Sequence, residues 1–313
     1  MNASAVGRFD HPENAGLSSQ TASVRLPAGG RGQAAGLAAL MEATAGRAEI
    51  IIAMIDGPVA VGHPDFHKEN MRYLDDKADV WCRHSQISAC VHGTFVAGLL
   101  HARRDAPAPG LCPGCTLLIC PIFHKQGSTS ASPDALVCAI IACVEAGARA
   151  INLSADMPGS QMFTHRGLDE ALDAAGARGV IIIAAAGNQP ILGSSLITRH
   201  RSVVPVVACD AKGVVLPSST LGASIGRQGL AAPGHDIISL APSGGLAKLS
   251  GSSAAAAFVT GTVALLWSAF PRADTASIRR AVLGGQRTRR AITPPLLDAR
   301  VAYASLRATQ RGA

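Results

Sequence analysis

The chain has 313 residues, of which 48% are hydrophobic and 16% are charged. This composition suits a compact α/β protein with buried parallel strands and is unlike that of a disordered chain. The formal net charge is +7, but aromatic residues make up only 4% and no basic run is interleaved with them. The sequence therefore argues against a nucleic-acid partner.

Residues 1–32 are rich in Gly, Ser and Ala and show no periodicity, so we expect a flexible N-terminal arm. They contain no charged segment followed by an apolar core, so no signal peptide is predicted. The apolar run at 259–267 is too short to span a membrane. The expectation is a cytoplasmic chain with no membrane partner, one structured domain over residues 33–308, and a short tail at 309–313.

Strand and helix signals alternate along that domain. Continuous apolar runs predict buried strands at 49–55, 115–123, 148–155, 179–186, 203–208 and 236–240. Helices are expected at 33–45, from His92 onward, from Pro133 to about residue 146, near 168–177, and from Ser253 onward. Because no repeat or linker divides the chain, we predict one mainly parallel sheet with helices on both faces.

Two polar residues stand at places where chemistry is expected. Asp56 directly follows the first strand, and catalytic groups in open α/β sheets gather at the carboxyl ends of strands. The alternative for Asp56 is a simple Asp-Gly turn. Ser253 precedes a long Ala- and Leu-rich stretch, at a helix start where free backbone N–H groups favour negative charge. Taken alone, Ser253 is better explained as a capping serine.

Eight cysteines are many for a cytoplasmic protein. Cys112 and Cys115 form a CxxC pair and, with Cys82 and Cys90, could supply four zinc ligands, although the spacing fits no common zinc pattern. Zinc binding, a local disulfide and ordinary thiols stay open as alternatives, and the compartment favours thiols. The cysteines are Cys82, Cys90, Cys112, Cys115, Cys120, Cys138, Cys143 and Cys209.

Four short stretches of sequence, taken together, indicate a shared role for Asp56 and Ser253. In order they are Ile55-Asp56-Gly57 with His63-Pro64-Asp65-Phe66, then His92-Gly93-Thr94, Ala185-Ala186-Gly187-Asn188, and Gly251-Ser252-Ser253. In order and spacing the chain resembles the subtilisin-like serine proteases over about residues 33–308. The resemblance implies a single-domain three-layer sandwich around a mainly parallel sheet.

The resemblance also implies a role for each catalytic residue. Ser253 would be the nucleophile, His92 its general base, and Asp56 the group that orients His92. Asn188 and the backbone N–H of Ser253 would form the oxyanion hole, although Asn188 alone could be a turn residue. A peptide substrate would lie extended against Leu153, Ser154 and Ala155. The small residues that would line the pocket for the residue before the cut are Ala155, Ala185, Ala186 and Gly187.

Some positions depart from the family pattern. Where the family usually has Gly-Thr-Ser-Met-Ala-x-Pro, Ala257 replaces the proline, and Phe258 replaces a common histidine that follows it. These changes affect the expected geometry of the helix and leave the chemistry in place. The segment 101–109 carries arginines where secreted relatives hold calcium, so no calcium is expected there. No metal or cofactor is predicted for the chain.

Within the family, the segments 53–59, 36–41 and 115–123 look most like the intracellular proteases that mature cyanobactin-type ribosomal peptides. The predicted function is therefore a serine endopeptidase that removes a leader from a precursor peptide. A macrocyclase using the same triad is the first alternative, but only 35 residues separate Asp56 from His92, which leaves little room for the inserted cap of such enzymes. An inactive peptide-binding relative is the second, and the complete triad argues against it.

Overall fold

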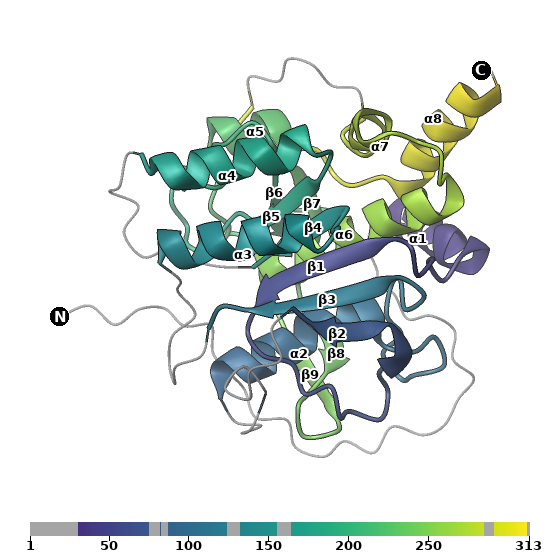
Figure 1. The fold of residues 1–313 in the computed structure, drawn as a ribbon. Coiled ribbons are helices and arrows are strands. Elements are labelled where there is room, and N and C mark those ends of the chain that lie inside the picture. Colours follow the sequence, from purple (N-terminus) through teal and green to yellow (C-terminus); the bar gives the residue numbers. More distant parts are fainter. Residues whose placement is uncertain are drawn as a thin grey trace.

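The computed structural model describes residues 31–74, 82, 87–123, 132–154, 164–284 and 291–311. Its centre is a sheet of seven strands in the order β2-β3-β1-β4-β5-β6-β7, in which every neighbouring pair is parallel (Figure 1). The strands are β1 (Ile51–Asp56), β2 (Met71–Tyr73), β3 (Thr116–Pro121), β4 (Ala150–Leu153), β5 (Ile181–Ala185), β6 (Val203–Cys209) and β7 (Leu230–Pro233).

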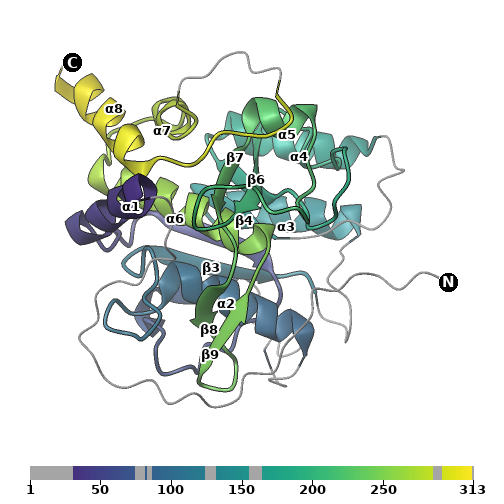
Figure 2. The ribbon, with the colours of Figure 1, turned by 180° about the vertical axis from the view of Figure 1, so that it is seen from behind.

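Helices cover both faces of this sheet, which confirms the predicted three-layer sandwich (Figures 1 and 2). One face carries α3 (Pro133–Glu145), α4 (Arg166–Ala177) and α5 (Ala223–Gln228). The other carries α2 (Ser88–His101) and α6 (Ser252–Ala269), with α1 (Arg31–Ala43), α7 (Thr275–Val282) and α8 (Ala299–Arg311) packed against α6. A 3-10 turn, η1 (Lys68–Asn70), precedes β2, and β8 (Ile237–Leu240) pairs with β9 (Leu246–Leu249) in a separate antiparallel hairpin.

The strands divide their side chains between two cores. Ile52 and Met54 of β1 pack into the core under α2 and α6, whereas Ala53 and Ile55 pack into the core under α3 and α4. This alternation follows from the two-residue period of a strand. Both faces of β1 are therefore buried, which explains why its sequence is a continuous apolar run.

Helix α6 crosses the core beneath four strands of the sheet. Among the described residues, α6 is the one helix that is long and apolar enough to span a membrane, with 18 residues and a mean hydropathy of 1.4. However, 89% of it is buried inside the protein. The helix is longer than the apolar run at 259–267 suggested, and its burial marks it as the core helix of the fold.

The structure moves several predicted boundaries. α1 begins at Arg31, so the last two residues of the expected arm, 31 and 32, are helical, and α8 continues past residue 308 to Arg311. α2 begins at Ser88, so the expectation that His92 opens this helix is wrong and His92 lies one turn inside it. The run at 236–240 forms a strand, but it belongs to the antiparallel hairpin and not to the parallel sheet.

The cysteines fall into different groups. Cys82 and Cys90 form a disulfide whose Cα atoms are 5.5 Å apart, so for this pair the local disulfide is the alternative that the structure selects. Cys112 and Cys115 are buried free thiols. Within the described ranges, no group of three or more His, Cys, Asp or Glu side chains is placed to hold a metal ion.

Candidate active site

Asp56 and His92 form a short ion pair at the carboxyl end of β1. Asp56 is the last residue of that strand and is fully buried, and its Oδ1 atom lies 2.6 Å from Nδ1 of His92. The same oxygen accepts a hydrogen bond from the Gly57 N–H at 2.6 Å. Its Oδ2 atom is buried and has no hydrogen-bond partner among the residues described. The imidazole of His92 is 27% exposed, so one side of this pair faces the surface.

The electrostatics of the pair favour a charged histidine. Burial by itself lowers the pKa of His92, because it penalises the imidazolium. The negative charge of Asp56 and its hydrogen bond act in the opposite direction and together outweigh burial, so the pKa of His92 is raised above its ordinary value of 6.5. A histidine in this state is well prepared to take a proton from a neighbouring group.

Close contact between two glycines brings Asp56 to His92. A side chain on Gly57 would collide with the backbone of Ala89 in α2, and one on Gly93 would collide with the carbonyl of Gly57. The end of β1 therefore crosses the first turns of α2 at a distance that only glycine permits. Thr94 of α2 also binds the segment after β1, because its Oγ1 accepts a hydrogen bond from the Ala60 N–H at 2.9 Å.

The turn before α6 is held by Asn188. Gly251 adopts a φ of 149°, and a Cβ at this position would lie 2.9 Å from Nδ2 of Asn188. The Oδ1 atom of Asn188 accepts a hydrogen bond from the Ser252 N–H at 2.8 Å, and the Ser252 hydroxyl accepts one from the Gly187 N–H at 3.2 Å. The turn after β5 and the start of α6 are thus joined through three contacts.

Ser252 and Ser253 occupy different environments within this turn. Ser252 is 1% exposed and its hydroxyl is engaged by Gly187, whereas Ser253 is partly exposed and its hydroxyl has no hydrogen-bond partner in the described structure. Gly251 is the N-cap residue of α6 and supplies no side-chain cap. Ser253 therefore lies inside the first turn and is not the capping residue, and its backbone N–H has no acceptor within the helix.

The predicted substrate-binding residues lie at the ends of two adjacent strands. Leu153 ends β4 and Ser154 follows it, while Ala185 ends β5 and is followed by Ala186 and Gly187. β4 and β5 are paired in register, with Leu153 beside Ala184. The structure therefore brings these two groups together at the carboxyl ends of the strands, the same end of the sheet that holds Asp56. Ala155 lies outside the described residues.

The structure does not join the histidine to the serine directly. No hydrogen bond links His92 to Ser253 among the described side chains, although α2 and α6 pack against each other. Catalytic hydrogen bonds are often long in ligand-free structures and shorten when substrate binds. His63, part of the first sequence stretch, contacts neither residue: it is buried, and its Nε2 lies 3.1 Å from the Gly245 carbonyl of the β8–β9 hairpin.

One supporting group was not singled out from the sequence. Asn152 is fully buried in β4; its Oδ1 accepts a hydrogen bond from the Thr260 hydroxyl of α6 at 2.9 Å, and its Nδ2 donates to the Ser154 hydroxyl at 3.1 Å. It therefore couples the strand beside the substrate-binding residues to the helix that carries Ser253. The available signal was a single amide within an otherwise apolar strand, since a buried polar group requires partners.

Comparison with known proteins agrees with this geometry. The sequence pattern of the subtilase family matches residues 47–293. Subtilisin DY from Bacillus licheniformis is 28% identical over 237 residues, which cover 74% of this chain and 81% of that protein. The structure of the prenylagaramide maturation protease PagA superposes with a TM-score of 0.76 at 29% identity, covering 87% of this chain and 98% of PagA. The protease domain of PatA, solved as an S218A mutant, gives 0.77 at 30% identity, covering 84% and 97%.

Proposed function

The chain belongs to the subtilase family of serine proteases, and from this premise we propose that it is an endopeptidase that removes a leader from a ribosomally made precursor peptide. It acts on peptide substrates, as subtilases do. The leader-removing activity is supported by the likeness to the maturation proteases PagA and PatA, which extends over nearly the whole length of each. The observation that carries a proteolytic mechanism is the 2.6 Å contact between His92 and a buried Asp56.

In the proposed reaction, the Ser253 hydroxyl attacks the carbonyl carbon of the scissile bond while His92 takes its proton. A serine hydroxyl is a weak nucleophile at neutral pH and needs such a base. Asp56 fixes the imidazole through Nδ1 and stabilises the imidazolium that forms. His92 then protonates the leaving amine, and water hydrolyses the acyl-enzyme by the reverse sequence of proton transfers.

The tetrahedral intermediate carries an oxyanion, for which we propose two donors. One is Nδ2 of Asn188 and the other is the backbone N–H of Ser253 at the start of α6. Both are neutral dipoles that are fixed before the reaction, so they stabilise developing charge without having to reorganise. The positive end of the α6 dipole adds to the same effect.

The assignment of Ser253 over Ser252 is supported by their environments. The Ser252 hydroxyl is buried and accepts a hydrogen bond from Gly187, so it is occupied within the turn. Ser253 is more exposed and carries no such bond. A fluorophosphonate probe should therefore label Ser253, and Ser253→Ala should abolish labelling while Ser252→Ala keeps it.

The leader-removing activity is tested with a peptide library that includes leader–core precursor peptides, with products identified by mass spectrometry. We expect a single internal cut that separates leader from core, with loss of turnover in Ser253→Ala. Cleavage at many unrelated sites would instead indicate a digestive protease. A core released as a ring would indicate transpeptidation. Labelling at Ser252, or no labelling of folded protein, would overturn the proposed triad.

A further inference from the structure

Six arginines gather at the amino-terminal ends of the strands, which is the end of the sheet opposite Asp56. Because parallel strands all begin at one edge, the residues that precede neighbouring strands lie side by side. Arg149 precedes β4, Arg178 lies just before β5, and Arg201 lies just before β6. Helix α7 and the turn before it add three more. We define the basic edge as Arg149, Arg178, Arg201, Arg272, Arg279 and Arg280.

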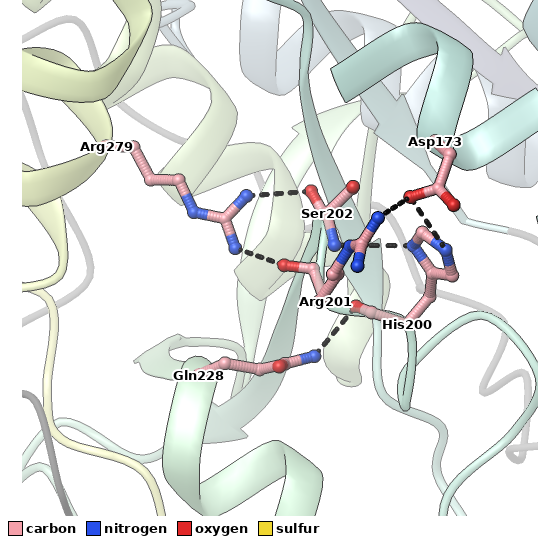
Figure 3. Close-up of polar contacts among 6 residues, drawn as sticks. All are labelled: Asp173, His200, Arg201, Ser202, Gln228 and Arg279. Carbon is pink, nitrogen blue, oxygen red and sulfur yellow. Dashed lines mark hydrogen bonds and ion pairs between the residues drawn. The ribbon is translucent and has the colours of Figure 1, made fainter. Parts of the chain in front are cut away.

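Contacts between the segments make the basic edge continuous. Arg279 donates hydrogen bonds to the carbonyls of Arg201 at 2.7 Å and Ser202 at 2.9 Å (Figure 3). The Thr275 hydroxyl of α7 donates to the Gly179 carbonyl, next to Arg178, at 2.7 Å. α7 is therefore fixed against the residues that precede β5 and β6.

The other end of the basic edge is joined through Trp267. The Arg149 guanidinium lies 4.3 Å from the centre of the Trp267 ring. The indole N–H of Trp267 donates to the Ala273 carbonyl, which immediately follows Arg272. All six arginines thus belong to one surface that runs from the start of β4 to α7.

Carboxylates at this surface are fewer, and Asp173 and Asp274 are already engaged. Asp173 pairs with Arg201 at 2.9 Å and lies 3.6 Å from His200, and Asp274 accepts a hydrogen bond from the Ser277 N–H as the cap of α7 (Figure 3 shows the first two contacts). Glu145, at the end of α3, is exposed and makes no hydrogen bond or ion pair among the described residues. Arg178 and Arg280 are exposed, and their side chains make no hydrogen bond or ion pair within the part of the chain that is described. The pKa of Asp274 is lowered by its hydrogen bonds to Ser277 and, to a smaller extent, by the nearby charge of Arg280.

We propose that the basic edge binds an acidic segment of the polypeptide substrate, remote from the bond that is cut. The inference rests on the proposed function, because it takes the bound segment to be part of a peptide substrate. Guanidinium groups match carboxylates in geometry as well as charge. Trp267, the ring under Arg149, is fully buried and therefore offers no stacking platform for bases.

The position of the basic edge sets the spacing required in the substrate. It lies at the opposite end of the strands from Asp56 and Asn188, and β6, with seven residues, is about 23 Å long at the usual rise of a strand. A peptide that engages both sites must therefore span at least about seven extended residues and more if it follows the surface. The acidic segment belongs to a long precursor and not to a short peptide.

Direct binding tests the surface independently of catalysis. Calorimetry compares a peptide of Glu-Gly repeats with one of Gln-Gly repeats, on the intact protein at about 0.1 M salt, where the Debye length is about 10 Å. We expect the acidic peptide to bind at least about tenfold more tightly and its affinity to fall as salt shortens the range of charge interactions. The variant Arg178→Glu/Arg280→Glu should lose that preference.

A matched control separates a local site from the overall charge. Lys68→Glu/Arg72→Glu makes the same change in net charge at η1 and β2, the outermost strand at the other side of the sheet. The control should keep the affinity within about twofold, since screening limits long-range effects at moderate salt. Equal losses in both variants, or equal affinity for the Gln-Gly peptide, would overturn the proposal. So would tighter binding of a single-stranded RNA of the same charge.

Cleavage then separates failure of this inference from failure of the proposed function. A cleavable sequence is joined to the Glu-Gly or Gln-Gly repeats through a flexible linker of about 15 residues. The acidic substrate should show an approximately tenfold higher kcat/KM in the wild type and no advantage in the Arg178→Glu/Arg280→Glu variant. Equal cleavage of both substrates by the wild type would overturn the proposed binding role of the basic edge and leave the proposed protease activity intact. Binding of the acidic peptide without any cleavage would overturn the proposed activity and leave the proposed binding role of the basic edge intact.

Discussion

Asn188 uses the two ends of its amide for different purposes. Its Oδ1 atom accepts the Ser252 N–H at 2.8 Å and so shapes the turn before α6. Its Nδ2 atom lies beside Gly251 and is the proposed donor to the oxyanion. A substitution that removes the whole amide therefore changes both the turn and the chemistry, and the two effects need separate variants.

Two substitutions at Asn188 distinguish its roles. Asn188→Ala removes acceptor and donor, whereas Asn188→Asp keeps an acceptor for Ser252 and removes the donor. Both should lower kcat by about 10²–10³ with little change in KM, because the donor acts on the transition state. Thermal melts should show a loss of stability mainly for Asn188→Ala. Normal kcat in a well-folded Asn188→Asp variant would exclude the oxyanion role.

The Asp56–His92 pair determines the acid limb of the activity profile. The proposed base must be neutral to accept a proton, and the pKa of His92 is raised above 6.5. Activity should therefore fall as the pH drops through a value above 6.5. In Asp56→Asn the anion that raises this pKa is absent, so the limb should move to lower pH and kcat should fall by about 10⁴.

The measurement is kcat/KM against pH for both proteins, with circular dichroism as the check on folding. Lys212→Gln changes an exposed residue after β6 and serves as the control. An acid limb at the same pH in wild type and Asp56→Asn would show that His92 is not the titrating group.

At the scale of elements, the clearest strand predictions are the longer strands that are buried on both faces. β1 and β6 are continuous apolar runs, and their signals are strong because nothing polar interrupts them. β2, β7 and β9 have three or four residues each and give no such signal. The amphipathic α7 and α8 were missed as well, because each has one buried stripe and a charged face.

The start of α2 shows a different limit. The sequence predicts that this helix starts at His92. The helix begins at Ser88 instead, and its cap, Ile87, contributes no side-chain hydrogen bond. What fixes this helix is tertiary: the backbone of Ala89 and Gly93 packs against Gly57. A sequence pattern does not contain such contacts between segments that are distant along the chain.

The end of α2 carries a pH-sensitive group. His101 is 1% exposed, and burial, the main cause, lowers its pKa to about 4, against 6.5 in the unfolded chain. Its Nε2 lies 3.2 Å from the His67 carbonyl. Because the unfolded chain binds a proton more readily, stability should be full above pH 6.5 and should decline toward pH 4. The full loss is about 3 kcal/mol, as an order of magnitude.

Denaturant unfolding at several pH values between 4 and 7 measures this effect. His101→Gln keeps an N–H donor near His67 and removes the titration, so its free energy of unfolding should vary less with pH than that of the wild type. His235→Gln changes an exposed histidine and should follow the wild type. Parallel curves for wild type and His101→Gln would exclude His101 as the source.

At the scale of the molecule, the prediction that no calcium is needed can be tested directly. Guanidinium groups occupy the loop after α2: Arg103 pairs with Asp105 at 3.0 Å, and Arg104 donates to the Leu111 carbonyl at 2.6 Å. A carbonyl already bonded to arginine is a poor calcium ligand. The melting temperature and activity should therefore be the same with and without EDTA. A fall of several degrees that calcium reverses would reveal a site elsewhere.

The arrangement of the parallel sheet separates two surfaces of the molecule. The triad of the proposed mechanism is assembled from Asp56 at the carboxyl end of β1, His92 in α2 and Ser253 at the start of α6. The basic edge is assembled from residues at the opposite ends. The first could be predicted from sequence because its motifs are short and local. The second could not, since its arginines are spread over more than 130 positions and meet only in the fold.

The stacking of Arg149 on Trp267 gives the protein an intrinsic optical reporter. The chain has two tryptophans, and Trp267 is fully buried with a cation over its ring. Indole emission responds to nearby charge. A carboxylate that draws Arg149 away from Trp267 should therefore change the wavelength and intensity of the Trp267 emission. In a Trp81→Phe background the signal would come from Trp267 alone. Occupancy of one end of the sheet could then be followed in real time, without a label, while a peptide is being cut at the other.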